Sequence, residues 1–455
     1  MSDLVVVANR SPVKLSKNAH GELEIQHSIG GVAPSLMTAL GDTKADWVAT
    51  ALTEEDVFAA ESNLPIDLDG INVRFVVLPE DVLDLSYTKV ANESLWFLCH
   101  GLFNATYGPV FNESFFTAWA AYRLHNEKIA EDICESASYG AKVLVNDYHF
   151  FLVGKYLKEK RPDLKTTYFL HTPFPTFDEL TVLPREVAKE LLGSMLDYGS
   201  CGFHTQRWQD RYTEAVGRMF GCDAKSYVAP LGVDVAALRE KTGDPVIKEQ
   251  AEEFLQRFAE KKIIYRTDRM EPSKNLLRGF LAFEELLSDN PSLNGRAVFF
   301  ARSYLSREKS SHYQMYKKEV LSEVERINKR FGEKDPVIEL ISSDNYNLSL
   351  AGMLTYDALL VNPIRDGMNL VAKEGVIINP KNSPLILSQE AGSYEEMQQA
   401  VLSINPYDVS ETADAMKRAL EMGEEEKVAR STQLRRILEK NQPVFWLSRL
   451  IEQAV

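Results

Sequence analysis

Short apolar runs alternate with longer amphipathic stretches along most of the chain. In the first half, apolar runs lie at residues 4–10, 74–79, 94–100, 142–147, 167–173 and 200–205, and helical patterns cover 113–138 and 184–196. Near-continuous apolar strands separated by helices indicate a parallel sheet that is covered on both faces. The first half is therefore predicted to be a doubly wound α/β domain.

The alternation pauses near residues 229–245 and then resumes. Strand-like runs follow at 263–269, 297–303, 337–344, 358–364 and 384–392, and the clearest helix of this half spans 310–331. The predicted organisation is an N-terminal domain over 1–235, a second α/β domain over 236–430, and a C-terminal helical segment over 431–455 that packs back toward the first domain.

Composition narrows the class of protein. A chain of 455 residues is too long for one core, and 45% hydrophobic with 26% charged residues is ordinary for a globular protein. The net charge of −15 argues against a nucleic-acid partner, but it leaves room for a local basic pocket and a small anionic ligand. The four cysteines lack metal-site spacing. Neither a leader nor an apolar run of membrane-spanning length is found, so we expect a cytoplasmic protein without membrane contact.

Cationic residues follow the first strand of the second half. Arg269 ends that strand, and Lys274 lies five residues on, across a turn that contains Pro272. In open parallel sheets, ligands bind beyond the carboxyl ends of the strands. Two cations beside a helix start suit a diphosphate, whereas the alternative is a solvated loop with incidental charges.

The segment NPIRDGMNLVAKE, residues 362–374, is the most distinctive on the chain. The predicted helix start would offer backbone amides to an anion. Gly367 lets a ligand approach the backbone, and the carboxylates could accept hydrogen bonds from sugar hydroxyls. The alternative is that Asp366 caps the helix. The residues that we assign to this site are Asp366, Gly367, Met368, Asn369, Leu370 and Glu374.

Further polar residues end strands of the first half. Asp147 and His171 follow neighbouring runs, where they could contact sugar hydroxyls, although a lone histidine is more often a core residue. Arg10 follows the first strand and can pair with a phosphate, and Gly31 precedes a predicted helix. The G-x-G-x-x-G fingerprint of nicotinamide-binding folds is absent after every strand, as are a Walker A loop, G-x-S-x-G and H-E-x-x-H.

Several segments resemble the signatures of retaining glycosyltransferase family 20, the trehalose-6-phosphate synthases, and the likeness is greatest to the actinobacterial type. They occur in order as ANRSP, NDYHF, FLHTPFP, DRMEPSK, PIRDGMNLVAKE, LSQEAG and INPYD. The resemblance implies a GT-B fold, in which two Rossmann-like doubly wound domains flank a cleft. It also implies transfer of glucose from a nucleoside diphosphate glucose to glucose 6-phosphate, giving α,α-trehalose 6-phosphate.

The resemblance implies roles by matching position. Arg10 and Arg307 would bind the acceptor phosphate, with Arg302 as a rival for the second place, and Asp147 would hold the acceptor sugar. His171 would contact the donor glucose, and the diphosphate would be held by Gly31, Arg269 and Lys274. The donor sugar and its phosphate would be bound by Asp366, Gly367, Met368, Asn369 and Leu370, and the ribose by Glu374. The predicted catalytic set is Asp147, His171, Arg269 and Lys274.

The acceptor side departs from the family pattern. Thr50 stands where many members have tryptophan, and Gly101 and Leu102 stand where they have tyrosine and arginine, whereas Trp119 matches an acceptor-side aromatic. Two alternatives therefore stay open: another phosphorylated polyol or cyclitol acceptor, and a catalytically silent sugar-phosphate sensor. The residues do not distinguish UDP, GDP and ADP donors, with GDP or UDP favoured by the actinobacterial likeness, and they leave a homo-oligomer possible.

The resemblance also implies a transfer on one face of the sugar, in which retention needs no protein nucleophile. The leaving diphosphate would take the proton from the acceptor hydroxyl, while Arg269 and Lys274 stabilise the growing charge. We expect neither a metal nor a cofactor, because the nucleotide sugar is a substrate.

Overall fold

The computed structural model describes residues 1–18, 23–27, 32–41, 43–104, 106–307, 310–332 and 335–455. The chain divides into two compact units: unit 1 comprises Met1–Leu231 with Pro443–Val455, and unit 2 comprises Gly232–Gln442. The predicted boundaries at 235/236 and 430/431 differ from this division. Helix α18 (Glu424–Leu438) packs on α15 (Leu370–Ile378) within unit 2, and only α19 (Pro443–Gln453) belongs to unit 1.

The main sheet of unit 1 has the strand order β10-β9-β8-β7-β1-β4-β6-β5 and is parallel except at β5. Its strands are β1 (Ser2–Val7), β4 (Ala45–Thr50), β5 (Ile66–Leu68), β6 (Ile71–Val76), β7 (Ala137–Asn146), β8 (Lys165–Leu170), β9 (Ser200–Phe203) and β10 (Ser226–Val228). The order reverses between β1 and β7. An antiparallel hairpin, β2 (Val13–Lys17) with β3 (Leu23–His27), stands apart.

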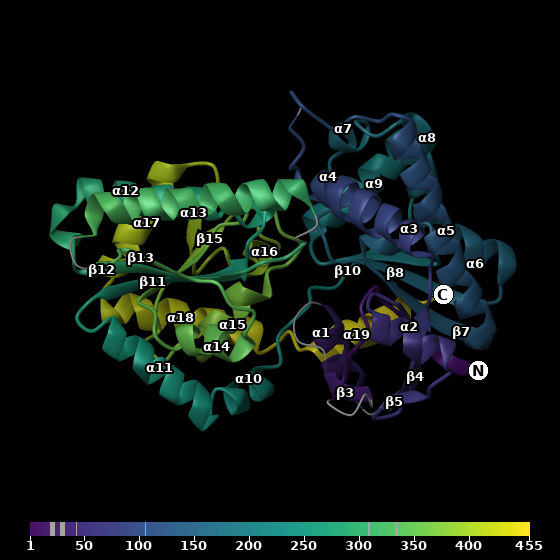
Figure 1. Ribbon diagram of the computed structural model, residues 1–455, viewed down its shortest axis with the longest axis horizontal. Coiled ribbons are helices and arrows are strands. Elements are labelled where there is room, and N and C mark those ends of the chain that lie inside the picture. Colours follow the sequence, from purple (N-terminus) through teal and green to yellow (C-terminus); the bar gives the residue numbers. More distant parts are fainter. Residues whose placement is uncertain (19–22, 28–31, 42, 105, 308–309, 333–334) are drawn as a thin grey trace. The chain divides into compact units, whose positions relative to one another are not determined.

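Helices cover both faces of this sheet. Figure 1 shows α5, α6 and α8 on one side and α1 with α19 on the other. The helices are α1 (Val32–Leu40), α2 (Glu54–Glu61), α3 (Glu80–Leu83), η1 (Asp84–Leu95), α4 (Trp96–His100), α5 (Glu113–Ser136), η2 (Tyr148–Phe150), α6 (Val153–Lys160), α7 (Phe177–Leu180), α8 (Arg185–Leu196), α9 (Gln206–Phe220) and α19.

The prediction of a strand over 94–100 was wrong. These residues continue a π-helical segment, η1, into the short helix α4, and all five residues of α4 are buried. A short apolar run that is buried on every side has no periodicity with which to tell a strand from a helix. Gly101 ends α4 in the left-handed conformation, with φ of 64°. Its departure from the family pattern therefore has a local structural reason.

The sheet of unit 2 is parallel, with the order β13-β12-β11-β14-β15-β16. Its strands are β11 (Lys262–Arg269), β12 (Ala297–Tyr304), β13 (Ile338–Ile341), β14 (Ala358–Val361), β15 (Leu385–Ser388) and β16 (Leu402–Ile404). In chain order this is 3-2-1-4-5-6, so the connections reverse between β11 and β14. The predicted α/β class, with two doubly wound parallel sheets, is confirmed.

Two hydrophobic layers enclose this sheet. Figure 1 shows α12, α13 and α17 along one face and α11, α14, α15 and α18 along the other, and each group shares a core with the strands. The helices are α10 (Val235–Lys241), α11 (Pro245–Arg257), η3 (Pro272–Lys274), α12 (Leu276–Asp289), η4 (Pro291–Leu293), α13 (Ser311–Phe331), α14 (Tyr346–Met353), α15, α16 (Tyr394–Met397), α17 (Val409–Glu421) and α18.

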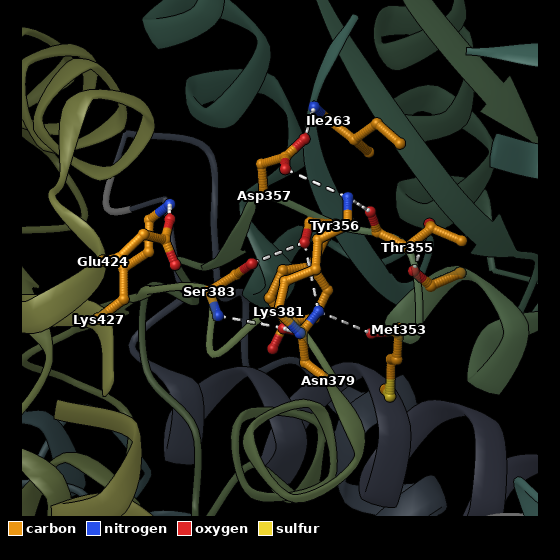
Figure 2. Close-up of polar contacts among 11 residues, drawn as sticks. Ile263, Met353, Thr355, Tyr356, Asp357, Asn379, Lys381, Ser383, Glu424 and Lys427 are labelled. Atoms are coloured by element: carbon orange, nitrogen blue, oxygen red, sulfur yellow. Dashed lines mark hydrogen bonds and ion pairs between the residues drawn. The ribbon is translucent and has the colours of Figure 1, made fainter. Parts of the chain in front are cut away.

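Polar side chains fasten the loops at the amino ends of β11 and β14 (Figure 2). Asp357 accepts from the Ile263 amide at 2.8 Å and pairs with Lys381 at 3.2 Å. The Asn379 amide group donates to two backbone carbonyls, those of Met353 and Tyr356. These side-chain contacts therefore stabilise the amino end of the sheet. They do not involve the polar groups at the carboxyl end, where the candidate site lies.

The C-terminal helix is bound tightly within unit 1. Trp446 of α19 is buried and lies 5.3 Å from Phe169 between ring centroids. Ser200 and Lys142 donate to carbonyls of Gln453 and Ile451 at 2.7 and 2.8 Å. The chain thus returns to unit 1 through hydrogen bonds as well as apolar contacts.

Candidate active site

Lys274 and Asp366 meet at the switch point of the sheet of unit 2. Lys274 ends the short helix after β11, Asp366 follows β14, and the ammonium Nζ lies 2.5 Å from Oδ2 of the carboxylate. Burial opposes the charge on Lys274, but Asp366 and Asp268 outweigh it and raise the pKa of Lys274 above its usual value. The ammonium therefore stays charged at the crevice where doubly wound sheets bind ligands.

Asp366 is held by backbone as well as by Lys274. Its amide donates to the Glu390 carbonyl at 3.1 Å, and its carbonyl accepts from the Gly392 amide at 3.0 Å. A Cβ on Gly392 would lie 1.9 Å from the Gly367 carbonyl oxygen, so only glycine fits there. The loop after β15 thus fixes the turn before α15.

The alternative in which Asp366 simply caps the helix is wrong. The N-cap of α15 is Asn369, whose Oδ1 accepts from the Ala372 amide at 3.1 Å and whose φ is 72°. The amide group of Asn369 donates to Asp366 at 3.0 Å. Met368 is buried, and its carbonyl accepts from the Ser393 amide at 2.6 Å. Leu370 opens the helix, in the first turn where backbone amides have no partner within the helix.

Glu374 lies one turn further along α15. Its Oε1 accepts a hydrogen bond from the Tyr346 hydroxyl at 2.9 Å. Burial raises the pKa of Glu374 to about 7, although the Tyr346 hydrogen bond acts in the opposite direction. A carboxyl group with a pKa near 7 can lose its proton when a ligand supplies hydroxyl groups that donate hydrogen bonds to the carboxylate.

Arg269 and Arg307 are joined by a carboxylate that the sequence prediction did not include. Arg269 Nε lies 2.6 Å from Oε1 of Glu271, and Arg307 Nη1 lies 3.1 Å from Oε2. The rival Arg302 is fully buried and donates to the Ser343 carbonyl at 2.9 Å. Arg302 therefore supports the loop after β13, and Arg307 remains the candidate for phosphate binding.

The switch point of unit 1 holds Arg10 and Asp147. Arg10 follows β1 with an exposed side chain, and its carbonyl accepts from the Trp47 indole at 3.2 Å. Asp147 follows β7 with φ of 75°, a conformation that costs a non-glycine residue of order 1–3 kcal/mol. Hydrogen bonds to β8 hold it there, because its amide donates to Phe169 at 2.8 Å and its Oδ1 accepts from the His171 amide at 3.3 Å.

His171 is oriented by Asn146. The amide group of Asn146 donates to the Val7 carbonyl at 3.1 Å, so its Oδ1 is left to accept from His171 Nε2 at 3.1 Å. His204 and Trp446 flank the ring at centroid distances of 5.1 and 5.6 Å. Burial lowers the pKa of His171 to about 3, so the imidazole is neutral at physiological pH. It can form hydrogen bonds, but it carries no charge.

The acceptor-side aromatic prediction does not agree with the structure. Trp119 is 1% exposed, and its indole nitrogen donates to Glu190 at 2.8 Å, so it is a core residue. Thr50, noted as a departure, is also buried, and its hydroxyl lies 2.9 Å from Nε2 of His125. Gly31 lies outside the described residues.

Sequence reasoning missed Glu271, Asn146 and Tyr346. Asn146 directly precedes Asp147 and was detectable as a second polar residue at a strand end. Glu271 lies between the two predicted cations, but its link to Arg307 spans 36 residues of sequence. Tyr346 reaches Glu374 from a separate helix, which no local pattern signals.

Within the described ranges, no helix is long and apolar enough to cross a membrane. Among those same residues, no group of three or more His, Cys, Asp and Glu side chains is placed to hold a metal ion.

Two doubly wound parallel sheets with polar residues at their switch points are typical of α/β proteins that bind ligands at the carboxyl ends of their strands. More specifically, the chain belongs to glycosyltransferase family 20, whose model matches residues 2–455. A bifunctional trehalose-6-phosphate synthase/phosphatase from Thermoproteus tenax is 31% identical over 97% of this chain, which spans 62% of that relative. A trehalose-6-phosphate synthase from Mycobacterium avium is 31% identical over 96% of this chain and 92% of its own. An E. coli structure bound with UDP-2-fluoro glucose matches with a TM-score of 0.86 and 25% identity, covering 99% of each chain.

Proposed function

We propose that this protein is a retaining glycosyltransferase that moves glucose from UDP-glucose to glucose 6-phosphate, forming α,α-trehalose 6-phosphate. The observation that carries the proposal is the cluster in unit 2, where Arg269, Lys274 and Asp366 gather at the switch point of a doubly wound sheet. Membership of glycosyltransferase family 20 and the name of the M. avium relative support the activity. The nucleotide bound in the E. coli structure supports UDP as the carrier.

The donor is held by unit 2 in this proposal. Arg269 and Lys274 bind the diphosphate, aided by the amides of Met368, Asn369 and Leu370. Asp366 and Gly367 contact the glucose, and Glu374 accepts from the ribose hydroxyls. Because Asp366 already pairs with Lys274, the diphosphate and the sugar share one hydrogen-bonded group.

Acceptor binding is assigned to individual residues. Arg10 and Arg307 bind the phosphate of glucose 6-phosphate, Asp147 binds its hydroxyls, and His171 contacts the donor glucose. Trp119 has no part, because its side chain is buried in the core. Since His171 is neutral, it aligns the sugar by hydrogen bonding and does not supply a proton.

The bond between C1 and the diphosphate oxygen breaks as the acceptor hydroxyl forms its bond to C1 on the same face. The hydroxyl proton passes to the departing diphosphate oxygen, so no protein base is needed. Arg269 and Lys274 stabilise the charge that grows on the diphosphate. Arg269 and Lys274 neutralise the charge on the diphosphate, a role that a metal ion could otherwise serve. We therefore propose that neither a metal nor a cofactor is required. Chelator should then leave the rate unchanged.

A transfer assay tests the proposal. Purified protein is given UDP-, GDP- or ADP-glucose, each with glucose 6-phosphate, glycerol 3-phosphate or an inositol phosphate. We expect the highest kcat/KM with UDP-glucose and glucose 6-phosphate. Efficient transfer only to a polyol or cyclitol phosphate would reassign the acceptor. Binding of sugar phosphate without any transfer or donor hydrolysis would indicate a sensor.

A further inference from the structure

Glu271 occupies a central position among the cations of unit 2. Its side chain is 0% exposed, and its two carboxylate oxygens contact different arginines, Oε1 with Arg269 at 2.6 Å and Oε2 with Arg307 at 3.1 Å. Its backbone joins the same turn, because its amide donates to Arg269 and its carbonyl accepts from Lys274. One residue therefore fixes both the local backbone and two guanidinium groups.

Electrostatics explains why an acidic residue lies here. A buried carboxylate is costly unless it is paired, and two neighbouring guanidinium groups repel each other unless an anion lies between them. Glu271 satisfies both conditions at once. Arg307 has φ of 52°, a conformation that persists only where the surroundings hold it, and the Tyr313 hydroxyl contacts the same guanidinium.

The contacts are compatible with phosphate binding. Arg269 meets Glu271 through Nε, on one edge of its planar guanidinium, and a guanidinium presents a second edge for a bidentate contact with phosphate. Arginine can bind a phosphate through two parallel hydrogen bonds, which lysine cannot do. Much of this advantage is lost when the guanidinium plane is free to rotate. A carboxylate that fixes the plane before the ligand arrives reduces this loss.

We propose that Glu271 is a positioning residue that orients Arg269 and Arg307 together, and thereby couples the binding of the donor diphosphate to that of the acceptor phosphate. The proposal rests on the proposed function, in which the two arginines serve different substrates. It predicts that one substitution, at a residue that touches neither substrate, weakens both.

Glu271→Gln keeps the shape of the side chain but removes its charge. We expect the Kd for UDP and the KM for glucose 6-phosphate each to rise about tenfold or more, with kcat also reduced. Isothermal titration with UDP and steady-state kinetics measure these effects. Arg269→Lys should instead act mainly on UDP, and Arg307→Lys mainly on glucose 6-phosphate.

The chain offers a matched control in Glu284, another glutamate of unit 2 that bridges two arginines, Arg326 and Arg330. Glu284→Gln should lower the thermal midpoint but leave both substrate constants within about twofold. If Glu271→Gln lowers only the midpoint, as this control does, Glu271 is merely structural and the proposal is overturned.

Other outcomes are equally decisive. If Glu271→Gln weakens the binding of only one substrate, Glu271 does not couple the two sites. If it tightens the binding of either substrate, Glu271 competes with phosphate for the arginines. If Glu271→Gln does not fold, Glu271→Asp keeps the charge with a shorter reach. Unchanged constants in that folded variant would also overturn the role. A wild-type protein that binds neither UDP nor glucose 6-phosphate would overturn the proposed function as well.

Discussion

Lys274 and Asp366 form the contact on which the donor site depends. The ammonium is largely buried and lies 2.5 Å from the carboxylate, which raises the pKa of Lys274 and keeps the lysine charged. An incoming diphosphate would therefore meet a cation that is already fixed in place. Preorganised charge of this kind stabilises a leaving group without reorganisation at the moment of reaction.

Removing this cation should be severe for catalysis. Lys274→Ala is expected to lower kcat by about a hundredfold, equivalent to ~3 kcal/mol, and it leaves the Asp366 carboxylate unneutralised beside the diphosphate. The initial rate of UDP release measures the effect. Lys381→Ala, which removes a lysine at the opposite end of the same sheet, is the control and should stay within about twofold. Near-normal turnover of Lys274→Ala would refute the assignment.

Glu374 predicts a pH dependence for donor binding. Its pKa of about 7 lies above the usual value for glutamic acid, so the side chain is half protonated near neutrality. Ribose hydroxyls donate better to the ionised form, so the affinity for UDP-glucose should rise between pH 6 and pH 8. Calorimetry between pH 6 and pH 8 measures how the affinity for UDP-glucose changes with pH. Glu374→Gln should bind more weakly and show no slope, and an equal slope in both proteins would exclude Glu374 as its source.

Site residues could be predicted from the sequence only where a local pattern marks them, and their partners from distant parts of the chain could not. Arg269, Lys274, Asp147 and Asp366 could be selected from the sequence because each lies at or after the end of an apolar strand, where such sheets bind ligands. Their partners were hidden whenever folding brought them from elsewhere. Asn146 reaches His171 only because β7 pairs with β8, and a sequence alone does not reveal that pairing.

At the scale of elements, the turn before α15 depends on the loop after β15. Gly392→Ala would bring a methyl group to within 1.9 Å of the Gly367 carbonyl oxygen, where backbone has to move. We expect at least a tenfold rise in KM for UDP-glucose, because Gly367 and Met368 shift with the loop. Gly423→Ala, at a glycine with nothing within 4 Å of the added carbon, is the matched control. Equal kinetics in the two variants would contradict this dependence.

The hydrophobic pattern of the sequence predicted long helices more accurately than short buried elements. Long amphipathic helices such as α5 and α13 were predicted nearly to their ends, since a 3.6-residue period persists over many turns. Residues 94–100 were misassigned, and β16, with three residues, was too short to detect. Burial on all sides removes the contrast between polar and apolar positions that such predictions require.

For the molecule as a whole, two histidines with a lowered pKa, the buried His125 and the partly buried His171, predict sensitivity to acid. Burial lowers the pKa of both His125 and His171 to about 3, whereas an unfolded histidine titrates near 6.5. Their contribution to stability is complete above about pH 6.5 and is lost as the pH falls toward 3. Each histidine should contribute a slope of about 1.4 kcal/mol per pH unit within that window.

Thermal unfolding from pH 7.5 to pH 4.5 tests this expectation. His125→Gln should lower the midpoint at pH 7.5, because the hydrogen bonds to Thr50 and Ser86 are disturbed. The difference between wild type and variant should then shrink as the pH falls, since glutamine does not titrate. Parallel curves over the whole range would mean that His125 does not control acid stability.

Domain organisation was predictable in outline from the two series of strands, because doubly wound sheets repeat one pattern. The point at which the chain returns to unit 1 was not predictable. Helix α18 has little amphipathic pattern and α19 has a clear one, but neither pattern shows which unit the helix contacts. Only the packing of α18 on α15, and of α19 on α1, decides the matter.

The central claim is transfer of glucose from a nucleotide sugar to a sugar phosphate with retention at C1. The most direct measurement is proton NMR of the product formed from UDP-glucose and glucose 6-phosphate by purified protein. The account predicts a single non-reducing product with both anomeric protons in the α configuration, and no such product with Arg269→Ala. A β-linked product, or release of free glucose without any disaccharide phosphate, would contradict it.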